Sequence, residues 1–112
     1  MIMKITTEKK AEVLVVHAEG RLDFMTAGEF EKEVSTLIQQ LKQNVLLDFE
    51  KLDYISSAGL RSILILAKET KTKGNILALC SLNETIKEVF CISKFDSIIT
   101  IYPTIEEGLA SM

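Results

Sequence analysis

The sequence predicts an α/β sandwich: a mostly parallel sheet of about five strands with one antiparallel edge strand, covered by four helices. From residue 12 onward, short apolar runs that suit buried strands alternate with segments that have helical apolar spacing. Each intervening segment is long enough to return the chain parallel to its predecessor on a right-handed path. With 112 residues, 47% of them apolar and 26% charged, the chain is expected to form one domain, residues 1–112.

The first two strands are expected at residues 3–7 and 12–18, joined by a charged turn at 8–10 into a hairpin. A loop at 20–23 leads to the first helix. The run from Thr26 to Glu29 fits a capping box, in which the Thr hydroxyl and the Glu carboxylate satisfy backbone donors, and Met25 and Phe30 are spaced for a hydrophobic staple. One apolar face follows at three- and four-residue steps: Ala27, Phe30, Val34, Leu37, Ile38 and Leu41.

The rest of the chain continues the alternation of strand and helix. Asn83 is expected to cap a short helix that contains Ile86, Val89 and Phe90, and Thr104 with Glu107 forms a second capping box that opens a terminal helix through Leu109. The remaining predicted elements are strands at 45–49, 76–80 and 98–101, and a helix that begins at Ser57 and stops at Gly74.

Charge and composition exclude several classes of function. Thirteen Lys and Arg against 16 Asp and Glu give a net charge of −3, without the basic block that tracks a nucleic acid. No apolar stretch is long enough to cross a bilayer, and the N-terminus lacks the apolar region of a signal peptide, so a cytoplasmic protein without membrane insertion is expected. Cys80 and Cys91 are interpreted as small buried apolar residues, and His17 is the only histidine, so neither a metal site nor a cofactor is predicted.

The most informative segment is residues 54–61, where an apolar strand meets a strongly apolar helix at Ser56 and Ser57, two residues before Gly59. A helix start gathers unpaired backbone N–H groups and the positive end of the helix dipole, so a serine there can cap the helix or carry a phosphate. A phosphoryl group on Ser57 would turn a neutral patch anionic and expel a closely packed partner. Arg61, one turn later, could contact a phosphate or a partner, or remain a solvated side chain.

An enzyme is disfavoured by the same residues. Ser57 as a nucleophile would need a positioned base, but His17 lies within the apolar second strand, and no Gly-x-Ser-x-Gly turn occurs. Asp23, Asp48 and Asp53 could gather near strand ends, but isolated carboxylates are more often loop caps than metal ligands.

In its order of motifs the chain resembles the STAS domain family, and within it the stand-alone anti-sigma factor antagonists. The motifs are residues 20–23 followed by Thr26, residues 45–49, residues 54–61 and residues 95–110, which together span essentially the whole chain. The resemblance implies that Ser57 is phosphorylated by a partner that is both anti-sigma factor and serine kinase, and that a serine phosphatase removes the phosphate. It also implies that the unphosphorylated form binds the anti-sigma factor and so frees a sigma factor for RNA polymerase.

Asp23 matches an acidic position in the loop that borders the phosphorylation site of such proteins. Many members carry Asp where this chain has Ser56, so Ser56 stays open as a second candidate acceptor. The alternative function is a STAS subunit of a lipid-transport or stress-signalling complex that binds its partner without obligatory phosphorylation. The residues expected to bind the partner are Asp23, Ser56, Ser57, Ala58, Gly59, Leu60 and Arg61.

Overall fold

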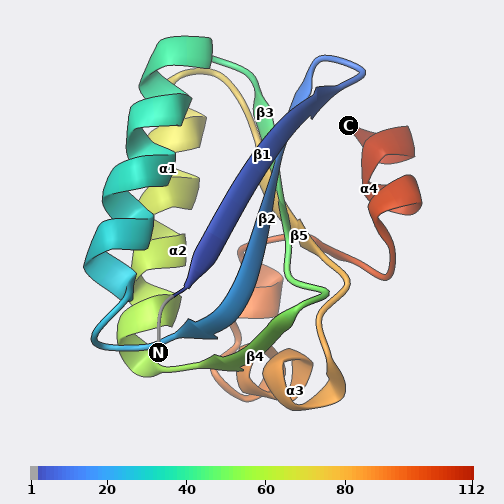
Figure 1. Cartoon of the computed structure of the whole chain (residues 1–112). Helices are drawn as coiled ribbons and strands as arrows, with labels where there is room; N and C mark the ends of the chain where they lie inside the picture. Colours follow the sequence, from blue (N-terminus) through green and yellow to red (C-terminus); the bar gives the residue numbers. More distant parts are fainter. Residues whose placement is uncertain (1–2) are drawn as a thin grey trace.

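A computed structural model describes residues 3–112 and confirms the predicted fold class, an α/β structure with one mixed sheet and four α-helices (Figure 1). A short 3₁₀ turn at Phe95–Ser97 follows α3. In chain order the elements are β1 Lys4–Lys10, β2 Val13–Leu22, α1 Ala27–Leu41, β3 Asn44–Asp48, β4 Leu52–Ile55, α2 Ser57–Thr72, β5 Leu77–Cys80, α3 Glu84–Ile92, β6 Ile101–Tyr102 and α4 Ile105–Ser111.

The sheet has the strand order β1-β2-β3-β5-β6, and β4 pairs with the far end of β2. Only β1 and β2 are antiparallel, while the other pairs run parallel, as predicted. The strand that leads into α2 is a separate short strand, β4. It was not distinguished from the strand predicted at 45–49, because its four residues bury only their two ends and show no clear strand period.

Strand β2 is long because it serves two neighbours in succession. Its first half pairs with β3 over Val13–His17, and its end pairs with β4 over Gly20–Leu22. The register shifts between Gly20 and Arg21, where Gly20 has a φ of 108°, a conformation that suits glycine. This irregularity carries Leu22 alongside Ile55, so β2 and β4 end together where α2 begins.

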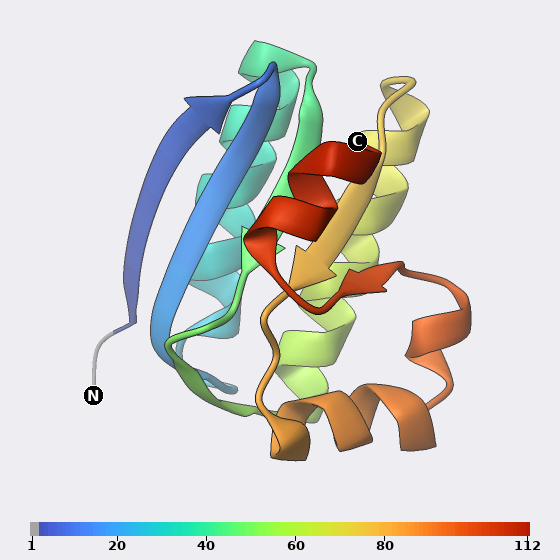
Figure 2. The same ribbon diagram turned by 90° about the vertical axis from the view of Figure 1, so that its right-hand side faces the viewer.

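The helices cover the two faces of the sheet unequally. Helices α1 and α2 pack side by side on one face over the main core, whereas α4 lies on the opposite face, as Figure 2 shows. The main core includes the buried α1 residues Ala27, Phe30, Val34 and Ile38, which confirms the predicted apolar face. On the α4 side the buried residues form a smaller cluster: Val13, Val15, Leu46, Ala78 and Cys80.

The hairpin turn lies later than predicted. Residues 8–10 belong to β1, and the connection is made by Ala11 and Glu12, both with positive φ, at 50° and 64°. Two consecutive left-handed residues give a tight turn whose twist matches the strands, so the strands extend through the charged segment.

The capping box predicted at the start of α1 is wrong, whereas the Asn83 cap of α3 and the Thr104 half of the capping box of α4 are confirmed. Thr26 makes no side-chain cap, because its hydroxyl donates to the Arg21 carbonyl at 2.8 Å and accepts from the Asp23 amide at 2.9 Å. Met25 is exposed, which removes the predicted staple. Asn83 and Thr104 cap their helices by accepting from the amides of Ile86 and Glu107.

Two further expectations near the C-terminus are corrected. The last strand covers only residues 101–102, because the Phe95 carbonyl accepts from the amides of Ile98 and Ile99 and holds the preceding residues in a turn. Cys91 lies exposed on the outer side of α3 rather than buried, while Cys80 is buried as predicted; both thiols are free. No helix within residues 3–112 has the length and apolar character to cross a membrane.

Candidate functional site

The candidate site is the junction at which β2, β4 and α2 meet. The backbone amide of Ser56 donates to the Leu22 carbonyl at 2.9 Å, which ties the start of α2 to the end of β2. The Leu60 amide in turn donates to the Ser56 carbonyl at 2.9 Å and closes the first helical turn. The loop that follows Leu22 therefore lies beside the first turn of α2, and the residues expected to bind the partner are brought to one end of the molecule.

The two serines differ in environment. Ser56 is the N-cap of α2, with extended backbone, and its half-buried hydroxyl accepts from the Gly59 amide at 3.3 Å. Ser57 is the first helical residue and is exposed, and its hydroxyl forms no hydrogen bond with any other described residue. Since Ser56 already serves the Gly59 amide, the amides of Ser57 and Ala58 are those of the first turn left for an external acceptor.

Gly59 lets α2 begin against the end of β2. A Cβ placed there would lie 2.7 Å from the Leu22 carbonyl oxygen and 2.9 Å from a side-chain carbon of Ile55. Gly59 and its neighbour Leu60 are both buried, so these two predicted partner-binding residues pack inward. Ala58 is half-buried, and Arg61 is exposed.

Asp23 shapes the loop beside the serines. Its Oδ1 accepts from the amides of Met25 and Thr26, at 3.0 and 3.2 Å. Desolvation by burial acts to raise the pKa of Asp23, but these two backbone hydrogen bonds, with further contributions from the Thr26 hydroxyl and Arg21, lower it overall. Asp23 is thus a carboxylate that fixes the loop conformation at neutral pH.

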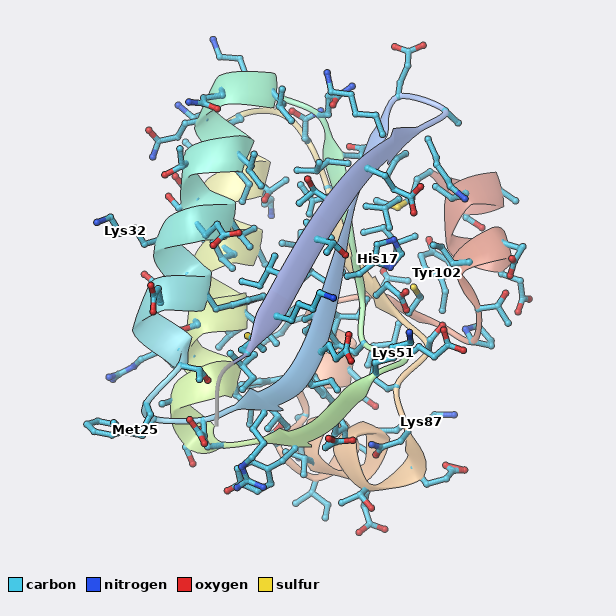
Figure 3. The ribbon with its side chains drawn as sticks, viewed as in Figure 1. His17, Met25, Lys32, Lys51, Lys87 and Tyr102 are labelled. Atoms are coloured by element: carbon cyan, nitrogen blue, oxygen red, sulfur yellow. The ribbon has the colours of Figure 1, made fainter. Side chains whose placement is uncertain are left out.

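Four residues at this end were not predicted as site residues. The Arg21 guanidinium lies over the Tyr54 ring, 4.2 Å from its centroid. Phe24 and Met25 are each 82% exposed, and in Figure 3 Met25 projects away from the body of the molecule where α1 begins. The sequence offers one signal, two adjacent apolar residues in a polar loop. The predicted staple of Met25 with Phe30 gave Met25 a packing role and did not include Phe24.

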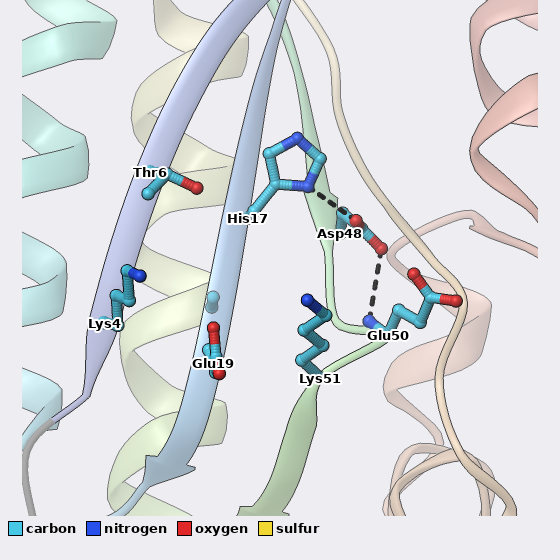
Figure 4. A pocket seen from close by; sticks show the side chains of 8 residues that line it. Lys4, Thr6, His17, Glu19, Asp48, Glu50 and Lys51 are labelled. Carbon is cyan, nitrogen blue, oxygen red and sulfur yellow. Dashed lines mark hydrogen bonds and ion pairs between the residues drawn. The ribbon is translucent and has the colours of Figure 1, made fainter.

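A second polar cluster lies on the sheet face that carries α4 (Figure 4). His17 Nδ1 is 2.6 Å from Asp48 Oδ2, and Nε2 is 2.6 Å from Glu8 Oε2. Desolvation acts to lower the pKa of His17, but its two carboxylate partners raise it overall. The cluster borders a pocket of about 280 Å³, whose other lining residues are Lys4, Thr6, Ala18, Glu19, Glu50 and Lys51.

The carboxylates that the sequence left open as a group do not come together. Asp48 is bonded to His17 at the end of β3, Asp23 lies in the loop before α1, and Asp53 is an exposed residue of β4. Within residues 3–112 no group of three or more His, Cys, Asp or Glu side chains is arranged to hold a metal ion. Burial, with a smaller effect of Asp48, raises the pKa of the Cys80 thiol to about 12, which keeps this thiol protonated.

Comparison with known proteins decides the family. The STAS domain model matches residues 4–108. The chain belongs to the STAS domain family. It is 36% identical over 109 residues to BtrV of Bordetella bronchiseptica, a protein named as a candidate anti-sigma factor antagonist; the match covers 97% of this chain and 94% of BtrV. It is 28% identical over 103 residues to the anti-sigma F factor antagonist of Paenibacillus polymyxa, covering 91% and 88% of the two chains.

Solved structures agree with this assignment. The crystal structure of a candidate anti-sigma factor antagonist of Thermotoga maritima superposes with a TM-score of 0.89 at 25% identity, covering 96% of this STAS domain and 92% of that chain. The unphosphorylated form of SpoIIAA, an anti-sigma factor antagonist, superposes with a TM-score of 0.72 at 21% identity, covering 96% of each chain. By homology this STAS protein groups with the anti-sigma factor antagonists.

Proposed function

We propose that this STAS protein binds an anti-sigma factor when unphosphorylated and releases it when Ser57 is phosphorylated. The observation that carries the proposal is the contrast between the two serines: Ser57 offers an exposed, unbonded hydroxyl within the described structure, whereas Ser56 uses its hydroxyl to cap α2. Ser57 is therefore the acceptor we assign, with Ser56 in a structural role.

The position of Ser57 explains how a charge can be added without unfolding the protein. A phosphate brings about −1.5 to −2 charges and three acceptor oxygens. At the start of α2 the helix dipole and the amides of Ser57 and Ala58 stabilise that charge. In support, SpoIIAA keeps the fold of this chain in both of its states: the unphosphorylated and phosphorylated forms superpose with TM-scores of 0.72 and 0.73.

The effect of phosphorylation falls on the partner. A protein packed over Ser57, Ala58 and Arg61 would meet a neutral to weakly cationic surface, which becomes anionic on modification. The partner we propose is an anti-sigma factor that is also a serine kinase, and a serine phosphatase restores the binding form. We place this exchange in the cytoplasm. There, the unphosphorylated chain binds the anti-sigma factor, which frees a sigma factor to bind RNA polymerase.

The proposal is tested with purified anti-sigma factor kinases from the same genome. After incubation with ATP, mass spectrometry should locate a single phosphate on Ser57, and Ser57→Ala should abolish it while Ser56→Ala keeps it. Ser57→Ala should bind the kinase as the wild type does, and Ser57→Asp should not. Phosphate on Ser56 would refute the assigned acceptor, and equal binding by Ser57→Ala and Ser57→Asp would favour the alternative of a STAS subunit that docks without phosphorylation.

A further inference from the structure

The loop between β2 and α1 presents two large apolar side chains to solvent next to the serine site. Phe24 and Met25 are each 82% exposed, more than any other large apolar residue in the described part of the chain. Isolated exposed apolar residues are common on protein surfaces, but two adjacent ones beside a proposed binding site form an apolar patch that is typical of a protein interface.

The loop holds these side chains in a defined conformation. The Asp23 carboxylate accepts from the Met25 and Thr26 amides, and the Thr26 hydroxyl bridges the Asp23 amide and the Arg21 carbonyl. The Ala27 amide also donates to the Asp23 carbonyl at 2.8 Å, which joins the loop to α1. A side chain displayed on a hydrogen-bonded turn loses little backbone entropy on binding, which favours its use as an anchor.

The loop and the serine site form one continuous surface. Leu22, which precedes the loop, packs its backbone against Gly59 and accepts a hydrogen bond from the Ser56 amide. Helix α2 and the loop therefore keep a fixed relation. A partner that covers Ser57 can reach Phe24 and Met25 without rearrangement of this chain.

Both arginines of the chain lie near the same junction. Arg21 is at the end of β2 where it pairs with β4, and Arg61 is exposed near the start of α2. Arg21 stacks on Tyr54 and makes one exposed contact of 3.5 Å with Asp23. Within residues 3–112, no carboxylate lies at ion-pair distance from Arg61. Aromatic residues, Met and Arg are the types enriched in the centres of protein interfaces.

We propose that Phe24 and Met25 are the apolar anchor of the partner interface: they insert into an apolar socket of the anti-sigma factor kinase whose rim carries carboxylates facing Arg21 and Arg61. This inference rests on the proposed function and assigns separate roles to the two parts of the surface. Phe24 and Met25 determine affinity and the choice of partner, while phosphorylation of Ser57 determines whether the partner is bound. The same carboxylates that attract the two arginines would repel a phosphate on Ser57.

The test compares two double variants that each replace a pair of exposed apolar residues by serine. Phe24→Ser with Met25→Ser removes the anchor. Ile76→Ser with Ile98→Ser is the matched control, because these residues are 60% and 66% exposed and Ile76 lies beyond the C-terminal end of α2, away from the serines. Binding to the purified anti-sigma factor kinase is measured by calorimetry, and thermal unfolding checks that both variants fold.

We expect the anchor variant to weaken binding roughly tenfold or more, as loss of an interface hot spot does, and the control variant to bind like the wild type. Arg61→Glu should also weaken binding. If the anchor variant binds like the wild type while Ser57→Asp still abolishes binding, the anchor is refuted and the proposed function stands. If it instead turns a dimer into a monomer without changing kinase binding, the patch belongs to a second copy of this chain, which also refutes the inference.

Discussion

At the scale of single residues, the candidate site depends both on the missing side chain of Gly59 and on the hydroxyls of the two serines before it. Gly59 leaves room for the Leu22 carbonyl, Ser56 supplies the cap, and Ser57 is left with a free hydroxyl within the described structure. Three neighbouring positions thus divide packing, capping and the proposed modification among them. The sequence predicted where this junction lies, but it could not separate the roles of the serines, because either could cap a helix by composition alone.

The packing role of Gly59 gives the first prediction. Gly59→Ala should lower the free energy of unfolding by about 1–3 kcal/mol, because its Cβ would overlap the Leu22 carbonyl and force α2 away from β2. Gly28→Ala is the matched control: it also adds a methyl group to a helix, but nothing lies within 4 Å of the new Cβ, so stability should be unchanged or raised by up to about 1 kcal/mol. Urea denaturation measures both, and equal effects would contradict the close-approach argument.

The second prediction concerns charge at Ser57. Ser57→Asp should leave the free energy of unfolding unchanged or raise it by about 0.3–1 kcal/mol, because a negative charge in the first turn interacts favourably with the helix dipole. Ser57→Lys should lower it by a similar amount. Thermal unfolding at low ionic strength provides the measurement. A Ser57→Asp variant less stable than Ser57→Lys would show that a phosphate at this position is not tolerated for the stated reason.

At the scale of elements, the strongest sequence signals were confirmed and the weakest were not. Helical periodicity and the Asn83 and Thr104 caps placed α1, α3 and α4 well. The short strands β4 and β6 form by pairing with β2 and β5, which are distant from them in sequence. The spacing of apolar residues along a short segment does not reveal such pairing. The Thr26 capping box failed for a similar reason, since the hydroxyl is used by a loop whose shape depends on Asp23.

The exposure of Phe24 and Met25 lay outside what sequence patterns predict. Apolar residues next to a helix start are normally expected to pack against the helix. Their display in solvent follows from the hydrogen bonds of the loop, which are tertiary features of the folded chain.

His17 joins three strands and gives the third prediction. Its ring bridges Glu8 of β1 and Asp48 of β3, and both ring nitrogens can donate only in the imidazolium form. Because these partners raise the pKa of His17 above 6.5, the stabilisation is complete below pH 6.5 and is lost as pH rises through the raised pKa. Lys4, Glu19, Glu50 and Lys51 also face this pocket and modulate the field.

The pH dependence is checked by urea denaturation and by hydrogen exchange of β1 between pH 5.5 and 9. Toward the upper end of this range, the free energy of unfolding of the wild type should fall. The opening free energy of the β1 amides, measured from their exchange rates, should fall as well. His17→Gln should lack this step, since it removes the titrating group but keeps a polar side chain. A pH profile of His17→Gln parallel to that of the wild type would contradict the assignment.

At the scale of the whole molecule, the exposed residues of the candidate site lie toward one end of the fold. The core clusters lie between the sheet and its helices, whereas Ser57, the loop at 23–26 and both arginines lie toward one end. A net charge of −3 is small enough that a phosphate of about −1.5 to −2 is a large change to the field at that end. The fold class and the start of a helix at Ser57 could therefore be predicted from sequence, while the exposure of Phe24 and Met25 required the structure.

The central claim is tested most directly by comparing the chain phosphorylated on Ser57 with the unmodified chain in calorimetric titrations against the same anti-sigma factor kinase, at one ionic strength. The account predicts saturable one-to-one binding by the unmodified chain and a loss of affinity of roughly a hundredfold or more on phosphorylation, with unchanged far-ultraviolet circular dichroism. Equal affinities for the two forms would contradict it.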